Sequence, residues 1–303
     1  MLTAGLGTRL QPLSRVRAKP AVPIAGQALA VRIIRWLAAQ HVRDLVLNLH
    51  HLPETITRHV GDGSGLGARI RYSWEAPILG SAGGPRKALP LLPDHDFFII
   101  NGDTLTDVDL TALAKSHRES GALVTMAVLG DKALVARYGG VVTDARGTVY
   151  GFVPKGPAAV GYHFVGVQMV NPSVFAGLPP DVPAETTRGV YRDLIAARPG
   201  SIRAFMARGD FWDVGTPSDY LSAALTIGGR EGVASPQIGT QSRIEETAEI
   251  LDSVIWDNVL VGAGARLERC VVADGVTIPR GARYANCSIV QGDAGLMAVD
   301  FTE

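Results

Sequence analysis

The chain has 303 residues, of which 47% are hydrophobic and 19% charged, so it holds enough apolar material for a sizeable core. The 29 basic residues equal the 29 acidic ones, which excludes a broad electrostatic grip on nucleic acid or on an anionic membrane. Two cysteines are too few for a disulfide scaffold or a four-cysteine zinc site. Without a signal-peptide pattern or a long apolar run, the sequence predicts a soluble cytoplasmic protein with no nucleic-acid or membrane partner.

Short apolar runs alternate with helical periods in the first part of the chain. Strands are predicted at residues 45–47, 70–72, 97–100 and 123–129, and helices at 82–92 and 110–120. Glycine-punctuated strands follow at 139–142, 149–153, 164–170 and 202–207, with helices at 188–197 and 218–227. This alternation is typical of a Rossmann-like α/β fold with a mostly parallel sheet, which binds ligands beyond the carboxyl ends of its strands. We expect a catalytic domain over residues 1–228 and a linker over 229–252.

A six-residue apolar period marks the last part of the chain, residues 253–303. The positions that share it are Ile255, Val261 and Leu267, then, after a slip of one residue, Val272, Ile278, Tyr284 and Val290. Such a period is typical of a parallel β-helix, so we predict a short left-handed one with about two triangular coils. Because a short stack leaves open ends, we expect it to pack against the catalytic domain or to join subunits of a homo-oligomer.

A glycine-rich loop near the start is the strongest chemical signal. Residues 4–13 read AGLGTRLQPL, and Lys19-Pro20 follows. Glycines let backbone N–H groups turn toward phosphate oxygens, and an arginine forks onto them. A dinucleotide fingerprint would need glycine in place of Leu10, and a P-loop would need Gly-Lys-Ser/Thr. The sequence therefore predicts a phosphate site of another kind.

This loop resembles the signature of the sugar-1-phosphate nucleotidylyltransferases, also called NDP-sugar pyrophosphorylases. Three later segments resemble that family's other motifs in order: LGSAGG at 79–84, NGD at 101–103 and WDVGTP at 212–217. The tail is similar to the β-helix of many members, mannose-1-phosphate guanylyltransferases included. The resemblance implies an enzyme that transfers a nucleotidyl group from an NTP to a sugar 1-phosphate and releases pyrophosphate.

The resemblance also implies roles for individual residues. Arg9 would hold the leaving pyrophosphate, Lys19 the phosphates at the reacting centre, and Asp103 and Asp213 one Mg²⁺, an ion that favours oxygen ligands. Either aspartate would otherwise cap a turn at the end of its strand. The residues implied in nucleotide binding are Leu2, Ala4, Gly5, Gly7, Thr8, Glu75, Gly80, Ala82 and Gly83.

The two substrates are predicted from weaker signals. Lys155 and Gly166 would face the sugar phosphate, although Pro154 stands where many members have a sugar-binding glutamate. Glu75 would accept from the ring N–H and amino group of guanine, which favours GTP, with uridylyl or thymidylyl transfer as the alternative. Few residues precede the glycine loop where relatives have a whole strand, so either the chain starts late or this strand is shortened.

Two other functions were weighed against the enzyme. A regulatory subunit that binds nucleotide-sugar without turnover would tolerate loss of Arg9, Lys19, Asp103 or Asp213, and all four are present. An acyltransferase in the β-helix would need a histidine base, and no histidine follows His163, so we exclude it.

Overall fold

The computed structural model describes residues 1–301, so the last two residues of the predicted tail lie outside the described part. The chain forms two compact units that interleave in sequence. Unit 1 holds Met1–Gly5, Ile33–His51 and Gly61–Phe211, and unit 2 holds Leu6–Arg32, Leu52–Val60 and the chain from Trp212 onward. Over residues 1–301, no helix has both the length and the apolar character needed to cross a membrane.

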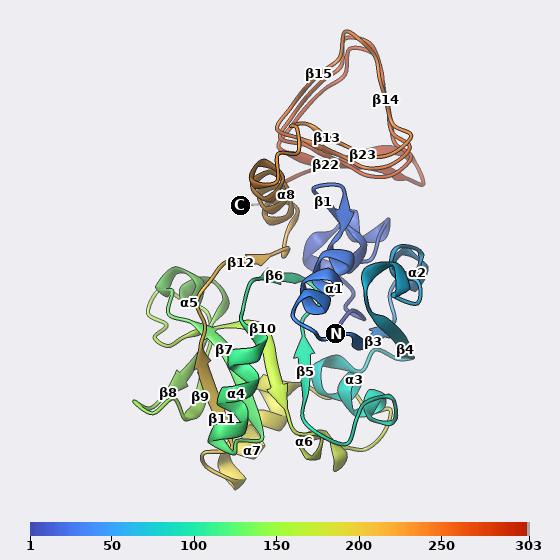
Figure 1. The fold of residues 1–303 in the computed structure, drawn as a ribbon. Helices are drawn as coiled ribbons and strands as arrows, with labels where there is room; N and C mark the ends of the chain where they lie inside the picture. The colour runs from blue at the N-terminus through green and yellow to red at the C-terminus, as the bar shows by residue number, and fades with distance from the viewer. Residues whose placement is uncertain (302–303) are drawn as a thin grey trace. The chain divides into compact units, whose positions relative to one another are not determined.

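The sheet strands of unit 1 confirm the predicted α/β class (Figure 1). Strand β3 (Asp44–Leu49) lies parallel to β4 (Arg69–Trp74), and β7 (Val124–Leu129) lies parallel to β11 (Ile202–Met206). Strand β10 (His163–Val170) is antiparallel to both β7 and β5 (Phe97–Ile100). Because β5 and β7 both run opposite to β10, strands β5, β7 and β11 all run in one direction and β10 in the other. The sheet is therefore mostly parallel, as predicted.

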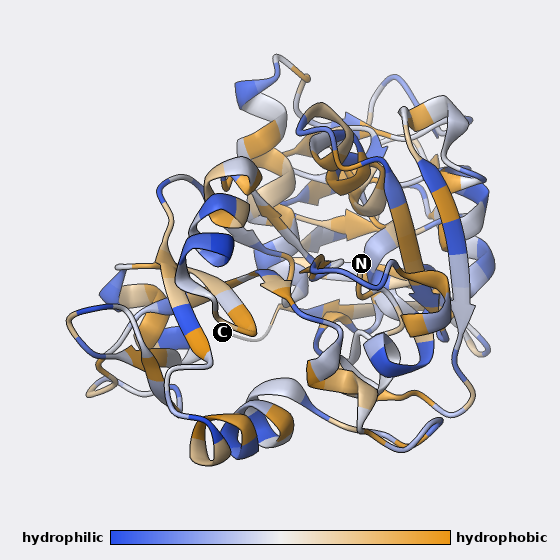
Figure 2. Ribbon diagram, turned by 60° about the horizontal axis from the view of Figure 1, so that its bottom comes forward, coloured by the Kyte–Doolittle hydropathy of each residue, from blue (hydrophilic) through white to orange (hydrophobic). Residues whose placement is uncertain are grey.

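Side-chain alternation sets the core of this unit, and Figure 2 shows the apolar strands. Phe97 and Ile99 of β5 and Val124, Met126 and Val128 of β7 are all buried in one cluster. Helix α4 (Leu110–Ser120) begins where Asp109 accepts from the backbone N–H of Ala112 at 2.9 Å.

The other α-helices and strands before the tail, in both units, are β1 (Pro23–Ile24), β2 (Gln27–Ala28), α1 (Leu29–Ala39), α2 (Pro53–Val60), α3 (Gly80–Ala88), β6 (Thr104–Thr106), α5 (Lys132–Tyr138), β8 (Gly140–Thr143), β9 (Val149–Val153), α6 (Ser173–Ala176), α7 (Tyr191–Ala197), β12 (Phe211–Asp213) and α8 (Pro217–Arg230).

The first strand is reduced to a single residue. Leu2 forms parallel bridges to Asn48, at the end of β3, and to Asn101, just after β5. The Met1 amine donates to the carbonyl of Val46 at 2.8 Å, and burial lowers its pKa from 8.0 to about 5. On the Met1 side of this bridge, β3 and β5 border a cavity of about 330 Å³ lined mainly by apolar groups. Leu2 is thus the residue of this chain that fills the place between β3 and β5 where the sequence comparison expected a whole strand.

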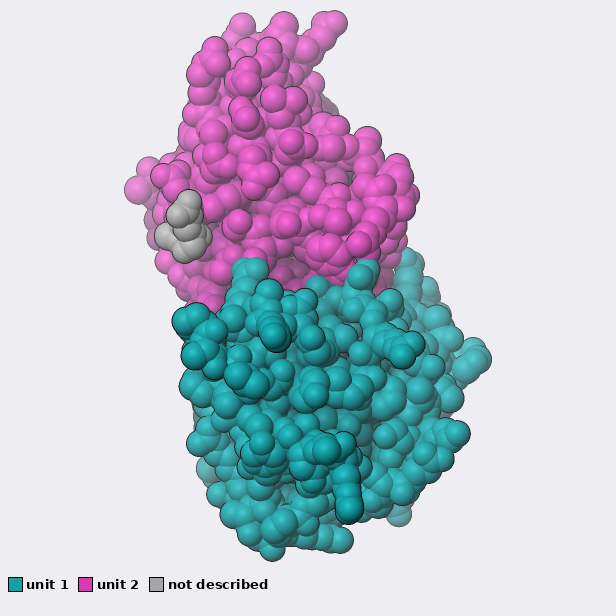
Figure 3. All heavy atoms as spheres, turned by 90° about the vertical axis from the view of Figure 1, so that its left-hand side faces the viewer, with its two compact units in different colours: residues 1–5, 33–51, 61–211 teal, residues 6–32, 52–60, 212–303 magenta. Residues whose placement is uncertain are grey.

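The tail in unit 2 is a parallel β-helix, coloured magenta with the rest of its unit in Figure 3. Its coils contain three strands each: β13 (Gln237–Ile238), β14 (Arg243–Ile244) and β15 (Glu249–Leu251), then β16 (Val254–Ile255), β17 (Leu260–Val261) and β18 (Arg266–Glu268), then β19 (Val271–Val272), β20 (Thr277–Ile278) and β21 (Arg283–Ala285). Hydrogen-bonded neighbours in adjacent coils are 17 residues apart, so each turn has two six-residue sides and one of five. The stack has three coils instead of about two, because its first coil lies inside the segment expected to be a linker.

An antiparallel hairpin closes the far end of this stack. Strand β22 (Cys287–Gly292) continues the parallel face, since Ile289 pairs with Val272, and β23 (Gly295–Asp300) folds back on it. Ile289, not Val290, therefore occupies the interior position that the period predicted. Each coil has one side of five residues instead of six, whereas the sequence analysis allowed for a single one-residue slip, between Leu267 and Val272.

Candidate active site

The predicted phosphate loop folds as a tight turn followed by a 3₁₀ helix, Thr8–Leu10. Gly7 is left-handed with φ 61°, and a Cβ on it would lie 3.1 Å from the Cβ of Ser14. Leu10 is fully buried and anchors the loop, while Gly5 and Thr8 are exposed. The loop thus keeps its polar backbone at the surface over an apolar anchor, as a phosphate-binding loop requires.

Two cations and a carboxylate meet next to this loop. The Arg9 Nη1 atom lies 3.8 Å from Oδ2 of Asp213, and the Lys19 Nζ atom lies 3.7 Å from Oδ1 of the same side chain. Lys19 and Asp213 have side chains only 9% exposed, whereas that of Arg9 is 61% exposed. The two positive groups beside this carboxylate are the residue types that hold phosphate groups in proteins.

The motif after β12 holds Asp213 in this position. Thr216 caps helix α8 and forms a capping box with Asp219, each backbone N–H donating to the other's side chain at 3.2 Å. A Cβ on Gly215 would lie 2.6 Å from Asp213 Oδ2 and 3.0 Å from Arg9 Nη1, so a larger residue there would push these two side chains aside. Our sequence analysis quoted Gly215 within the motif at 212–217 without a role of its own and missed Asp219, although Thr-Pro-x-Asp is itself a helix-start signal.

Asp103 follows β5 in unit 1, at the carboxyl end of the strand as predicted. The backbone N–H of Gly102 donates to the carbonyl of Leu2 at 2.9 Å, and the N–H of Asn101 donates to the carbonyl of Gly166 at 2.8 Å. Gly166 has φ 77°, and a Cβ on it would lie 2.8 Å from the Asn101 side chain. Gly166 therefore lets β10 approach the turn that carries Asp103.

Glu75 is buried and engaged within the protein. Its two oxygens accept from the side-chain amide of Asn48 at 2.7 Å and from the backbone N–H of Leu79 at 2.8 Å. A Cβ on Gly84 would lie 2.6 Å from the Glu75 carboxylate, so helix α3 packs directly on it. The carboxylate anchors the start of α3, and its role in base recognition stays a prediction.

The other predicted contacts fall in different surroundings. The N–H groups of Ala82 and Gly83 both donate to the carbonyl of Ala184, and a Cβ on Gly80 would lie 2.8 Å from that carbonyl. Lys155 is exposed in the loop after β9, while Ala4 is buried. The backbone N–H of Leu2 donates to the carbonyl of Ile100 at 2.8 Å, so it forms part of the sheet. The nucleotide- and sugar-binding roles of these residues stay predictions.

The Asp213 carboxylate is a ligand of the type that a hard divalent cation favours. Among residues 1–301, no three His, Cys, Asp or Glu side chains gather into a ready-made metal site. Carboxylate oxygens such as those of Asp213 suit Mg²⁺, which completes its coordination with water and substrate phosphates. Arg9 and Lys19 beside that carboxylate would hold the same phosphates.

Comparison with known proteins agrees with the motifs. The model of the nucleotidyl transferase family matches residues 1–229, and that of the GlmU-like C-terminal hexapeptide matches residues 218–285. The chain is 31% identical to a UTP–glucose-1-phosphate uridylyltransferase of Synechocystis sp. over 293 residues, covering 88% of this chain and 74% of that protein. It is 28% identical to a mannose-1-phosphate guanylyltransferase of Mycobacterium tuberculosis over 305 residues, covering 89% and 82%.

Among solved structures, HddC from Yersinia pseudotuberculosis complexed with GMP-PN is similar. The TM-score is 0.65 at 26% sequence identity, over 75% of this chain and 97% of that one. The family model spans most of the chain, and the four ordered motifs lie within its match. The chain therefore belongs to the nucleotidyl transferase family, the sugar-1-phosphate nucleotidyltransferases that its motifs resemble, and carries a hexapeptide-repeat tail of the GlmU-like type.

Proposed function

We propose that the protein transfers a guanylyl group from GTP to mannose 1-phosphate, releasing pyrophosphate. The observation that carries nucleotidyl transfer is the cluster of Arg9, Lys19 and Asp213, in which the N-terminal loop segment meets a segment about 200 residues later in the chain. Support for guanine comes from the guanylyltransferase relative of M. tuberculosis and from the HddC complex with GMP-PN.

In this mechanism a phosphate oxygen of the sugar 1-phosphate attacks the α-phosphorus of the NTP. The new P–O bond forms as the bond to the bridging oxygen of pyrophosphate breaks, and that oxygen carries away the negative charge. Lys19, buried beside Asp213, would offset charge at the reacting centre, and the exposed Arg9 would hold the leaving pyrophosphate. Both cations also offset the repulsion between the two anionic substrates.

We further propose that Asp213 and Asp103 bind Mg²⁺. The ion would neutralise charge on the NTP phosphates. Lys155 and Gly166 would face the sugar phosphate, and the loop residues Gly5, Gly7 and Thr8 the nucleotide. A cytoplasmic location and an oligomer formed through the tail remain predictions of the same proposal.

Uridylyl transfer to glucose 1-phosphate is the second candidate, and the Synechocystis relative favours it. Pyrophosphate release should be measured with GTP, UTP, dTTP, CTP and ATP, each against mannose 1-phosphate and glucose 1-phosphate. We expect the highest kcat/KM with GTP and mannose 1-phosphate. A clear preference for UTP and glucose 1-phosphate would replace the first candidate with the second.

A further inference from the structure

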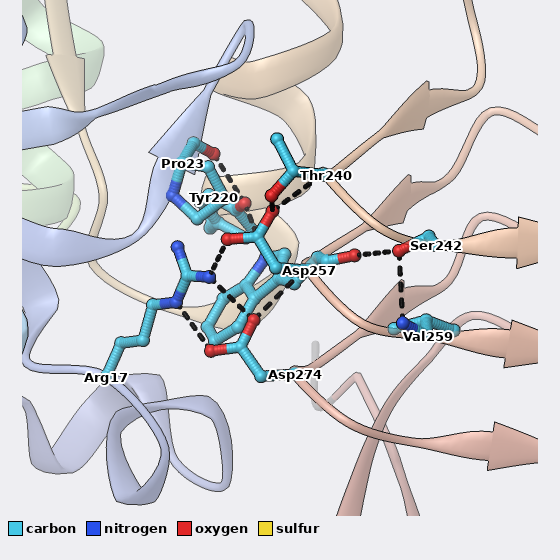
Figure 4. Close-up of polar contacts among 9 residues, drawn as sticks. Arg17, Pro23, Tyr220, Thr240, Ser242, Asp257, Val259 and Asp274 are labelled. Atoms are coloured by element: carbon cyan, nitrogen blue, oxygen red, sulfur yellow. Dashed lines mark hydrogen bonds and ion pairs between the residues drawn. The ribbon is translucent and has the colours of Figure 1, made fainter.

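Arg17 links the phosphate-loop segment to the β-helix within unit 2. Its Nε donates to Asp274 Oδ2 at 2.7 Å and its Nη2 to Asp274 Oδ1 at 2.6 Å, while Nη2 also donates to Asp257 at 2.5 Å (Figure 4). The Arg17 side chain is only 8% exposed. A buried, two-pronged guanidinium–carboxylate contact is among the strongest and most directional polar contacts in proteins.

The two carboxylates belong to one rigid corner of the stack. Asp257 and Asp274 are 17 residues apart, and the backbone N–H of Asp257 donates to Asp274 Oδ1 at 3.0 Å. Asp257 in turn accepts from the backbone N–H of Thr240 at 2.7 Å, in the coil before. Burial disfavours the charges, yet the contacts with both aspartates raise the pKa of Arg17, and Arg17 helps to lower the pKa of Asp257. The corner therefore holds a fixed ion cluster across three coils.

A second set of contacts connects Pro23, which follows Lys19 in the chain, to helix α8 and the β-helix. The Arg17 guanidinium lies 5.2 Å from the ring centroid of Trp256, whose Nε1 donates to Tyr220 Oη at 2.9 Å. Tyr220 Oη donates to the carbonyl of Pro23 at 2.6 Å. Lys19 thus sits between two points, Arg17 and Pro23, that are both held by the same block of α8 and β-helix residues.

From this arrangement we propose that Arg17 is a positioning residue for nucleotidyl transfer. The β-helix, through Arg17, fixes the backbone that places the Lys19 ammonium beside Asp213. The inference rests on the role proposed for Lys19 in the reaction. It makes the tail part of the scaffold of the active site, in addition to any role in assembly.

A purely structural ion pair offers a matched control in the same unit. Arg32 Nη1 and Nη2 donate to the two oxygens of Glu231 at 2.6 and 2.8 Å, a fork of the same kind. This pair joins α1 to the end of α8. Because Arg32 also donates to the carbonyls of Ile24 and Ala25, close to Pro23, the control variant is Glu231→Gln, which leaves those two contacts in place. If Arg17 only stabilises the fold, Asp274→Asn and Glu231→Gln will have equivalent effects on turnover.

The test compares Arg17→Lys and Asp274→Asn with the control Glu231→Gln, each assayed well below its Tm. We expect kcat to fall about 10- to 100-fold in the first two variants, since a misplacement of about 1 Å costs up to 100-fold, and to stay within about two-fold in Glu231→Gln. Adding Arg17→Lys to Lys19→Ala should cost less than about two-fold more, because Arg17 acts through Lys19. Equal kcat values in Asp274→Asn and Glu231→Gln, or fully additive losses in the double variant, would overturn the inference.

Hydrogen exchange separates this inference from the proposed substrates. The N–H of Ala21 donates to Ala18 at 2.8 Å and that of Ala18 to Thr55 Oγ1 at 3.0 Å, so both amides report on the Lys19 turn. Asp274→Asn should speed their exchange in the substrate-free protein, and Glu231→Gln should not. If wild type turns over neither GTP nor UTP, the proposed function fails while this readout still applies. Unchanged exchange in Asp274→Asn would contradict the positioning role.

Discussion

The Nζ atom of Lys19 lies 3.7 Å from Oδ1 of Asp213, and both side chains are nearly buried. One comes from the turn after the glycine loop and the other from β12, just before α8. An ammonium and a carboxylate held together beside the glycine loop are groups that contact phosphate and the metal ion bound to it. A nucleotide supplies such phosphates.

Asp213→Asn should leave the fold intact and abolish most metal-dependent turnover. The substitution keeps the size of the side chain but removes a charge that would bind the cation, a loss of several kcal/mol of transition-state stabilisation. The same result is expected for Asp103→Asn. Steady-state kinetics over a Mg²⁺ titration measures it, with the surface variant Asp44→Asn as control, since that exposed carboxylate pairs with the exposed Arg69. Wild-type kcat in either active-site variant would remove that aspartate from the metal site.

Arg9→Ala should reduce kcat by about 100-fold or more while leaving stability unchanged. The Arg9 side chain is 61% exposed, so its loss leaves the core untouched, whereas a preorganised charge on the leaving group is worth that much. Pyrophosphate release measures turnover, and thermal unfolding checks the fold. KM for the sugar 1-phosphate should change far less. An enzyme with normal kcat but a raised KM for that substrate would place Arg9 at the acceptor instead.

Trp256→Ala should destabilise the protein by about 3–5 kcal/mol, the usual range for deleting a buried aromatic. Trp256 is completely buried and donates to Tyr220, so the variant loses both packing and a hydrogen bond. Trp74→Ala is the matched control, because Trp74 in β4 is 58% exposed. Urea unfolding should show a large loss for the first variant and a small one for the second. Similar losses in both would mean that Trp256 does not anchor the tail.

The Met1 amine should make stability depend on pH between about 5 and 8. Burial lowers its pKa from 8.0 to about 5, so the folded chain binds fewer protons than the unfolded chain in this window. Stability should therefore fall as the pH decreases from 8 to 5, by at most about 1.4 kcal/mol per unit, and this contribution should level off below pH 5.

Acetylation of the amine is the control for that prediction. It removes the titrating group, and the adjoining cavity of about 330 Å³ has room for the acetyl group. The histidines are the same in both forms, including His117, whose pKa is lowered by burial. The difference between the two unfolding curves therefore isolates Met1. Identical pH dependence of acetylated and unmodified protein would show that the amine is not buried.

The sequence predicted the regular elements well, because their signals are local. The strand at 97–100 and the helix at 110–120 match β5 and α4 residue for residue. The β-helix period was visible, but Val290 was assigned in place of Ile289 because one five-residue side per coil has to be counted every turn. The first coil was missed because its interior-facing residues, such as Ile244, are interrupted by polar neighbours.

The sequence predicted only part of the candidate site, because some of its contacts join residues that are far apart in the chain. Arg9, Lys19 and Asp213 carry family motifs, and the structure brings them together. The burial of Glu75 depends on Asn48 and on helix α3, which the sequence around Glu75 does not reveal. Arg17 has no signal at all, because its partners are set by the register of coils that lie more than 200 residues away.

The central claim is that this cluster joins a nucleotide to a sugar phosphate, and ³¹P NMR of the reaction tests it most directly. Wild-type protein with GTP, mannose 1-phosphate and Mg²⁺ should convert the α-phosphorus signal into that of a sugar-linked diphosphate, with one pyrophosphate per product. Lys19→Ala should slow this conversion strongly. Consumption of GTP to GMP and pyrophosphate without a sugar-linked product, or equal rates in wild type and Lys19→Ala, would contradict the account.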